Sequence, residues 1–263
     1  MDEHAAWLAA ADPRRRIGHA VEAHLQIGST NDRARELVGE GRGGIAVVAE
    51  EQVAGRGRRG RTWSSPPGVN LMVSVGIRPH LPAADAWQLG QAVALAAREA
   101  CGAVAGTELK WPNDLIAADG RKLGGILVET ALDGDRVAIA VLGIGVNVNW
   151  PIEAMPEEIR DSATSLHALS GAPVDRVALL DRLMGALDEE VAAIEAGRSP
   201  LERYRAACRT LGAQVVVVTG GESVSGRAVD LDETGGLVVD TDAGRRRTVA
   251  SGEVVRVRPV VPA

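Results

Sequence analysis

The chain has 263 residues, which suits one large domain or one large domain followed by a small one. Apolar residues make up 46% of the chain and aromatic residues only 2%, so the core must rest on Ala, Val, Leu and Ile. With 29 Lys and Arg against 35 Asp and Glu, the net charge of −6 argues against a surface that binds nucleic acid everywhere.

No run of 18 apolar residues exists, and the N-terminal charges stand in the opposite order to a signal peptide. The sequence therefore predicts a cytoplasmic protein with no membrane segment. Cys101 and Cys208 stand in no CxxC motif, which excludes a zinc site of that kind and favours small buried thiols.

Periodicity and turn residues predict the elements in chain order. Residues 1–18 form a short lead with one helix, and residues 20–27 alternate as a half-buried strand. Ser, Thr and Asn in GSTND suit the start of a helix. After this helix we expect a strand at 45–51, an irregular loop at 55–68 and a strand at 70–77. Beyond these we expect a helix at 82–102, strands at 108–116, 124–132 and 137–149, and helices at 173–197 and 200–212. After residue 212, five short β runs separated by Gly, Asp and Ser predict a small barrel.

The loop at 55–61 combines three Gly with four Arg at positions 56, 58, 59 and 61. GRGRRG matches the G-x-G-x-x-G pattern of dinucleotide-binding folds, but Pro66 and Pro67 exclude the helix that should follow it. Arginine forks match phosphate and carboxylate oxygens, and Gly lets the backbone approach a ligand. The loop therefore predicts a polyanionic ligand, against the alternative of a solvated charged loop. Because nothing apolar lies between Gly55 and Thr62, we expect the loop to be mobile until an anion binds.

Two further clusters carry polar groups beside glycine. In KWPND, Asn113 and Asp114 offer oxygens that suit Mg²⁺ on phosphates, or alternatively a turn. Lys122 precedes Gly124 and Gly125. It is either a surface lysine or a lysine that reaches into a pocket. In GIGVNVN, Asn147 is either the capped end of a strand or a ligand contact.

Together, GSTND, AEEQVAGRGRRGRTWSSPPG, KWPND, RKLGGILVE and GIGVNVN occur in the order and spacing of the biotin protein ligases, which the chain resembles from about residue 18 to its end. The resemblance implies an α+β fold with a central mixed, largely antiparallel sheet and flanking helices, followed by a small SH3-like barrel. It implies a lead at 1–18, a biotin- and ATP-binding catalytic domain at 19–211 and the barrel at 212–263. The activity implied is a ligase that forms biotinyl-5′-AMP from biotin and ATP with Mg²⁺, then transfers biotin to one lysine of a biotin carboxyl carrier domain of an acyl-CoA carboxylase.

The resemblance also assigns residues to roles. Lys122 and Arg58 are the catalytic cations, which neutralise the biotin carboxylate and the α-phosphate that it attacks. Asp114 is a weak candidate Mg²⁺ ligand. The nucleotide-binding residues that it implies are Arg58, Arg61, Asn147 and Trp63. Trp63 would stack on adenine, with a loop anchor against the core as the alternative. The biotin-binding residues are Ser29, Thr30, Asn31, Gln52, Gly55, Arg56, Gly57, Arg58, Lys122, Gly124 and Gly125.

Two alternatives stay open at this point. One is a lipoate–protein ligase, which uses the same acyl-adenylate chemistry. The other is a nucleic-acid-binding module that uses the Arg/Gly loop, although the net charge and the lack of interleaved aromatics oppose it. About 18 residues precede the first matched strand, too few for a winged-helix domain, so we expect a monofunctional ligase with no sequence-specific DNA partner. The sequence leaves open whether the chain is a monomer or a homodimer.

Overall fold

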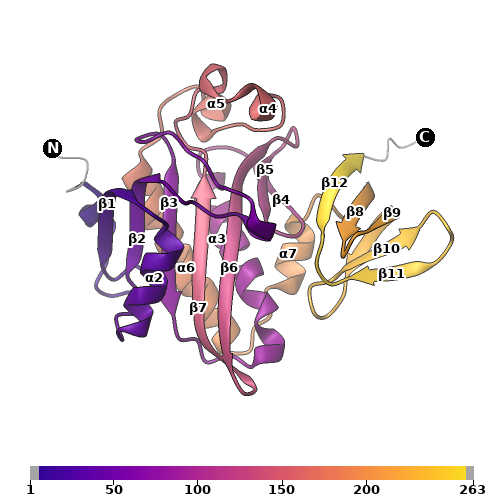
Figure 1. Cartoon of the computed structure of the whole chain (residues 1–263), viewed down its shortest axis with the longest axis horizontal. Helices are drawn as coiled ribbons and strands as arrows, with labels where there is room; N and C mark the ends of the chain where they lie inside the picture. Colours follow the sequence, from indigo (N-terminus) through magenta and orange to yellow (C-terminus); the bar gives the residue numbers. More distant parts are fainter. Residues whose placement is uncertain (1–5, 259–263) are drawn as a thin grey trace.

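The computed structural model of the protein describes residues 6–258 and contains two sheets. The first has seven strands in the order β1-β2-β3-β7-β6-β5-β4 (Figure 1). Only β1 and β2 pair in parallel, so the predicted mixed, largely antiparallel sheet is confirmed. The bounds of its strands are β1 (Val21–Ile27), β2 (Ala46–Gln52), β3 (Leu71–Ile77), β4 (Thr107–Lys110), β5 (Asp114–Ala117), β6 (Lys122–Asp133) and β7 (Arg136–Val146).

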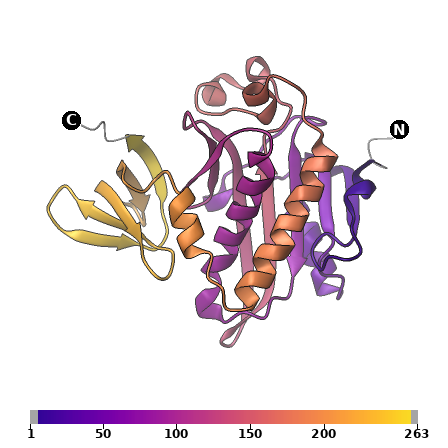
Figure 2. The ribbon, with the colours of Figure 1, turned by 180° about the vertical axis from the view of Figure 1, so that it is seen from behind.

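Helices cover both faces of this sheet. α2 (Thr30–Gly39) lies in front in Figure 1, while α3 (Trp87–Gly102) and α6 (Arg176–Glu195) cross the back (Figure 2). Val, Leu, Ile and Ala supply most of the buried side chains of the core between them, as the composition predicted. The shorter helical segments are η1 (Leu8–Ala10), η2 (Arg58–Gly60), η3 (Ala83–Asp85), η4 (Ile152–Ala154), α4 (Glu157–Arg160), α5 (Leu166–Ser170) and α7 (Leu201–Ala207). Within residues 6–258, no helix combines the length and apolarity that a lipid bilayer requires.

The C-terminal sheet confirms the five predicted β runs. It is antiparallel throughout, in the order β11-β10-β9-β8-β12. Its strands are β8 (Gln214–Thr219), β9 (Glu222–Leu231), β10 (Leu237–Thr241), β11 (Arg246–Val249) and β12 (Glu253–Arg258). The indole Nε1 of Trp111, in the turn between β4 and β5, donates a hydrogen bond at 3.0 Å to the carbonyl of Gly235, in the turn between β9 and β10. This bond links the two sheets. The change of sheet falls near residue 211, and the division into separate domains there stays a prediction.

Two strand expectations were wrong in detail. Residues 108–116 form a hairpin rather than one strand, because Pro112 lacks a ladder N–H and Asn113 favours a turn. Strand β7 ends at Val146 instead of continuing to residue 149. The N-terminal lead holds only a short helical segment around η1, and its first five residues lie outside the described range. Trp7 anchors this lead, because its buried indole Nε1 donates to Oε1 of Glu50 at 2.7 Å.

Candidate active site

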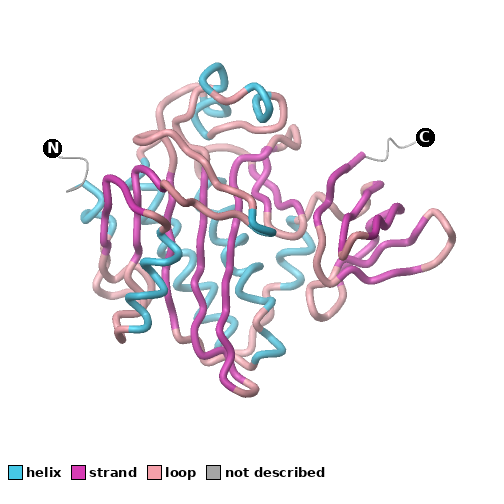
Figure 3. The backbone as a smooth tube through the Cα atoms, viewed as in Figure 1, coloured by secondary structure: helices cyan, strands magenta, loops and turns pink. Residues whose placement is uncertain are grey.

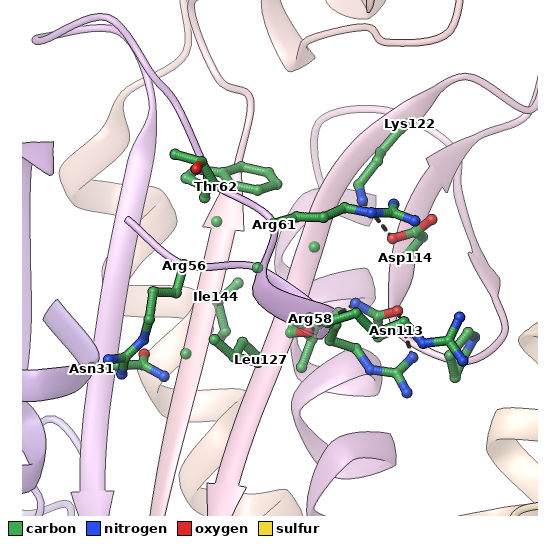
Figure 4. Close-up of a pocket in the computed structure, with 18 of the residues that line it drawn as sticks. Asn31, Arg56, Arg58, Arg61, Thr62, Asn113, Asp114, Lys122, Leu127 and Ile144 are labelled. Atoms are coloured by element: carbon green, nitrogen blue, oxygen red, sulfur yellow. Dashed lines mark hydrogen bonds and ion pairs between the residues drawn. The ribbon is translucent and has the colours of Figure 1, made fainter. Parts of the chain in front are cut away.

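The segment between β2 and β3 crosses in front of β7 and β6 and carries η2 (Figure 3). A cavity of about 150 Å³ lies between this segment and the sheet. Twelve of the residues predicted for the site line this one cavity: Ser29, Thr30, Asn31, Gln52, Arg56, Gly57, Arg58, Arg61, Trp63, Asp114, Lys122 and Gly125. Residues that are distant in the sequence therefore meet in one place, as Figure 4 shows for those that it labels.

One end of the cavity is a buried chain of hydrogen bonds at the start of α2. Oε1 of Gln52 accepts from the backbone N of Thr30 at 2.8 Å and from its hydroxyl at 3.1 Å. The hydroxyls of Thr30 and Ser74 lie 2.7 Å apart, and Ser74 donates to Oδ1 of Asn31 at 2.6 Å. Nδ2 of Asn31 donates in turn to Oε2 of Glu129 at 2.7 Å. This end offers both donors and acceptors, held in place because each side chain fixes the next.

The other end is cationic. Nζ of Lys122 lies 2.6 Å from Oδ1 of Asp114, and Nζ of Lys110 lies 3.7 Å from Oδ2 of the same carboxylate. Lys110 and Lys122 are the only two lysines in the whole sequence, and both lie at this end of the cavity. Two ammonium groups beside one carboxylate leave a net positive charge, which suits an anionic ligand.

Arg58 supplies a third cation at this end. Its Nη1 donates to Oδ1 of Asn113 at 3.1 Å, and Asn113 is itself bound to β6 because its Nδ2 donates to the carbonyl of Ile126 at 3.0 Å. The pKa of the Arg58 guanidinium is lowered, first by burial and then by the charge of Arg59. A half-buried cation whose desolvation is unfavourable gains from an anion placed beside it.

The arginines of the Arg/Gly loop have protein partners that the sequence did not indicate. Arg56 pairs with Asp32 at 2.8 Å and with Glu129 at 3.1 Å. Arg59 donates to the carbonyl of Val218 at 3.2 Å, and Arg61 pairs with Glu253. The sequence showed the repulsion among the arginines but not these partners, because the acidic groups come from α2, β6 and β12.

The C-terminal sheet also reaches the cavity. Gly252, Glu253 and Val254, around the start of β12, belong to its lining. The partners of Arg61 and Arg59, Glu253 and Val218, lie on neighbouring strands of that sheet. The loop is therefore attached to both sheets.

Three residues predicted as ligand contacts do not line the cavity. Gly55 lies where an added β-carbon would be 2.4 Å from the carbonyl of Trp63, so it permits the loop to close on itself. Gly124 packs against the backbone of β7, because adjacent strand residues face opposite sides of a sheet. Asn147 is buried at the end of β7, where its Nδ2 donates to the carbonyl of Thr164 at 3.0 Å. The ligand-binding roles of these three residues stay predictions.

Sequence reasoning assigned no role to several residues of the cavity. Ser74 is a polar residue in the otherwise apolar run LMVSVGI, and this was a signal that it contacts something other than the core. Lys110 is the first residue of the KWPND motif. Its role became clear only from the structure, where its ammonium group and that of Lys122 both lie beside Asp114. Glu253 gave no signal, because it is one of several charges on a short strand far along the chain.

The residues offer little to a resident metal ion. Within residues 6–258 no cluster of three or more His, Cys, Asp or Glu side chains has the arrangement that a metal requires. The carboxylates of the cavity lining are those of Asp114 and Glu253, and each is already paired with a cation. A divalent ion at this site would have to arrive with a ligand that supplies most of its oxygens.

Comparison with known families agrees with this geometry. Residues 25–147 match the biotin/lipoate A/B protein ligase family, and residues 210–257 match the biotin protein ligase C terminal domain. The first match runs from within β1 to the residue after β7 and includes most of the cavity, whereas the second covers nearly all of the C-terminal sheet.

Individual relatives cover most of the chain. It is 38% identical over 248 residues to the biotin–[acetyl-CoA-carboxylase] ligase of Mycobacterium tuberculosis, a match of 90% of this chain and 89% of that protein. It is 33% identical over 230 residues to the bifunctional ligase/repressor BirA of Escherichia coli, a match of 86% and 70%. The structure of a biotin protein ligase from Aquifex aeolicus in complex with biotin and ATP matches with a TM-score of 0.76 and 30% identity, over 91% of this chain and 98% of that one. The chain therefore belongs to the biotin/lipoate A/B protein ligase family, and its second sheet is the C-terminal domain of a biotin protein ligase.

Proposed function

We propose that the protein activates biotin with ATP as biotinyl-5′-AMP and then transfers biotin to one lysine of a biotin carboxyl carrier domain. The single observation that carries this proposal is the polarity of the cavity. A chain of hydrogen-bonding groups from the half-buried Gln52 to the buried Asn31 lies at one end, and Lys122, Lys110 and Arg58 lie at the other. Biotin has the same polarity, with a cyclic urea at one end and a carboxylate at the other.

The polar end suits a cyclic urea. Such a ring has one carbonyl acceptor and two N–H donors, and it needs partners of both kinds when water is excluded. Ser29, Thr30 and Asn31 are buried and bring hydroxyl and amide groups to this end. The apolar body and chain of biotin would then lie against Leu127 and Ile144.

The cationic end suits the first chemical step. One carboxylate oxygen of biotin attacks the α-phosphorus of ATP, a P–O bond forms, and pyrophosphate leaves with the electrons of the bond that breaks. Because the carboxylate and the phosphate repel each other, the step needs cations that face both. Lys122 and Arg58 are the groups that we assign to this role, with Lys110 as additional positive charge.

Magnesium belongs to this proposal as a partner of ATP. The ion would neutralise phosphate oxygens when bound, and Asp114 is the residue at the cationic end with a carboxylate to offer it. Lys122 and Lys110 hold that carboxylate in place, so Asp114 orients both ammonium groups whether or not it contacts a metal.

The second step needs an amine from another protein. The acceptor lysine attacks the acyl carbon of biotinyl-AMP, an amide bond forms, and AMP leaves with the former carboxylate oxygen. A water molecule in the same position would hydrolyse the mixed anhydride, so the loop that covers the cavity protects the intermediate.

The experiment that tests this function is ATP–pyrophosphate exchange, measured with biotin and with lipoate in parallel. Exchange that depends on biotin supports the proposal, and exchange that depends only on lipoate would assign the chain to the other branch of its family. The arginines of the loop oppose the alternative of a nucleic-acid-binding module. They pair with acidic groups around a cavity instead of forming an open basic face. Specific DNA binding that falls steeply with salt would favour that alternative.

We also infer a cytoplasmic location. Cys101 and Cys208 are both free and buried, and burial raises the pKa of the Cys101 thiol to about 12, which keeps it protonated and unreactive. Cell fractionation with a tagged chain tests this inference, and gel filtration with light scattering distinguishes the monomer from the homodimer.

A further inference from the structure

The indole of Trp63 lies directly on the bare backbone of two opposed glycines. Gly125 of β6 and Gly145 of β7 are cross-strand partners. A β-carbon added to Gly145 would lie 2.6 Å from both Cε2 and Cζ2 of Trp63, and one added to Gly125 would lie 3.2 Å from Cζ3. The ring therefore occupies the space in which the side chains of two ordinary strand residues would stand.

Neither glycine is needed for the path of the backbone. Both lie within regular antiparallel pairing, and neither has the positive φ that excludes other residues. Alanine could adopt the same conformation at both positions, so the missing side chain is what each contributes to the structure.

Packing rather than hydrogen bonding holds the indole. Its Nε1 is buried and has no hydrogen-bond partner among the described residues, whereas its backbone N donates to the carbonyl of Gly55 at 2.9 Å. With one anchor at the backbone, the position of the ring depends on the surface beneath it. Nζ of Lys122 lies 5.9 Å from the centre of the ring, so this surface also sets the distance between the aromatic platform and the catalytic lysine.

We propose that Gly125 and Gly145 form a seat for Trp63 and act as positioning residues for the nucleotide. The seat holds the indole as a fixed platform on which the adenine stacks, at a set distance from Lys122. The inference rests on the proposed function, because it takes the nucleotide to be ATP. A platform that is already fixed needs no further ordering when the base binds, and this favours affinity.

The two glycines should differ in importance. At Gly145 the three atoms nearest to an added β-carbon all belong to Trp63, at 2.6 to 3.0 Å, so alanine there forces the indole to move. At Gly125 the contact with Trp63 is 3.2 Å and that with Nζ of Lys122 is 3.5 Å, so small adjustments accommodate a methyl group. The effect of Gly145→Ala should therefore exceed that of Gly125→Ala.

The test is the dissociation constant of ATP, measured by calorimetry beside that of biotin. Loss of ordered base stacking predicts an increase of about tenfold in the constant for ATP with Gly145→Ala, and of less than about threefold with Gly125→Ala. With Gly145→Ala the constant for biotin should stay within about twofold, since the urea-binding end is untouched. Gly39→Ala is the matched control, because an added β-carbon there meets no atom within 4 Å.

A double-mutant cycle separates the seat from a general effect on the sheet. In a Trp63→Ala background the added methyl of Gly145→Ala has space, so it should cause no further loss of ATP affinity. An equal loss with and without Trp63, or a Gly145→Ala variant that binds ATP as tightly as the unmodified chain, would overturn the proposal. An unmodified chain that forms no biotinyl-AMP would instead contradict the proposed function, and the platform role with it, before any variant is compared.

Discussion

The ammonium nitrogen of Lys122 lies 2.6 Å from Oδ1 of Asp114, at the end of the cavity opposite the buried hydroxyls. This pair places a fixed positive charge beside the position that we assign to the biotin carboxylate. The carboxylate of Asp114 keeps the ammonium in place before substrate binds, so little reorganisation is needed during the reaction.

Replacement of this lysine should therefore reduce the rate of adenylate formation far more than stability. Loss of electrostatic stabilisation at the reacting oxygens predicts a fall of about 10²- to 10³-fold for Lys122→Ala, with little change in melting temperature. Arg121→Ala is the matched control, because the neighbouring arginine pairs with Asp119 and does not line the cavity. Near-normal adenylation by a folded Lys122→Ala protein would remove this lysine from the mechanism.

Ligands should protect the Arg/Gly loop from trypsin. The side chains of Arg56 and Arg61 are 40% and 61% exposed. Exposed ion pairs contribute only about 0 to 1 kcal/mol each, so these two pairs hold the free loop weakly. Biotin with ATP should slow cleavage in the loop several-fold, while pyrophosphate alone should protect it less. The bond after Arg245, in the turn before β11, provides an internal control that ligands should not affect. Equal cleavage of the loop with and without ligand would show that the loop is not a lid.

Arg58→Gly should release the adenylate from the cavity. The variant loses the contact with Asn113 and the cation beside the phosphate, so biotinyl-AMP should escape and label lysines of a bystander protein such as serum albumin. The bystander is necessary because the chain itself has only two lysines.

Arg59→Gly is the comparison for this experiment. Arg59 has a φ of 58°, which glycine adopts readily, and its side chain contacts the carbonyl of Val218 rather than the cationic end. Labelling confined to the carrier domain with Arg58→Gly, or equal stray labelling by both variants, would contradict the role of Arg58.

The link between Arg61 and the C-terminal sheet should matter for the nucleotide. Glu253→Gln removes the partner charge of Arg61 but keeps its shape, so the loop should be attached less firmly and the KM for ATP should rise about two- to fivefold. Glu222→Gln is the control, since Glu222 pairs with Arg247 within the C-terminal sheet, away from the cavity. Identical KM values for both variants would show that the C-terminal sheet does not contribute to the site through this pair.

Most of the fold follows from local patterns in the sequence. The alternation around β1, the small apolar face of α3 and the short runs of the C-terminal sheet were each visible as periodicity. The turn at Trp111–Asn113 could not be told from a continuous strand by periodicity, because the residues on both sides of it are β-like. Pro112 and Asn113 were the local signal for this turn. Periodicity carries no information about which strands pair at a distance, so strand order required the structure.

The site divides in the same way. Residue types within one motif, such as Lys122 beside Gly125, could be assigned from the sequence and its resemblance to a family. Contacts between motifs could not, and these include the pairs that hold Arg56 and Arg61 and the seat beneath Trp63. Each depends on long-range packing, which places groups together that are 24 to 192 residues apart.

One stability prediction concerns the pair that joins β1 to α2. The pKa of Glu22 is lowered to about 2, first by its hydrogen bond with Arg33. A carboxyl whose pKa is lower in the folded state stabilises the fold above its unfolded pKa of about 4.5, and this contribution disappears as the pH falls towards 2. Solvent screening limits the contribution to about 1 kcal/mol.

The measurement is the free energy of unfolding at pH 6 and at pH 3 for the unmodified chain and Glu22→Gln. At pH 6 the unmodified chain should have a larger free energy of unfolding than Glu22→Gln. At pH 3 this difference between the two proteins should be smaller. A difference that stays constant across this range would show that ionisation of Glu22 is not the cause.

Attack of the biotin carboxylate on the α-phosphorus of ATP is tested most directly by following oxygen. Biotin labelled with ¹⁸O at both carboxylate positions is incubated with the protein, ATP, Mg²⁺ and a biotin carboxyl carrier domain, and the released AMP is analysed by mass spectrometry. The proposed pathway predicts one ¹⁸O atom in each AMP formed, because the oxygen that attacks phosphorus stays with it when the acceptor lysine breaks the C–O bond. Biotinylated carrier together with unlabelled AMP, or with ADP and labelled phosphate, would contradict it.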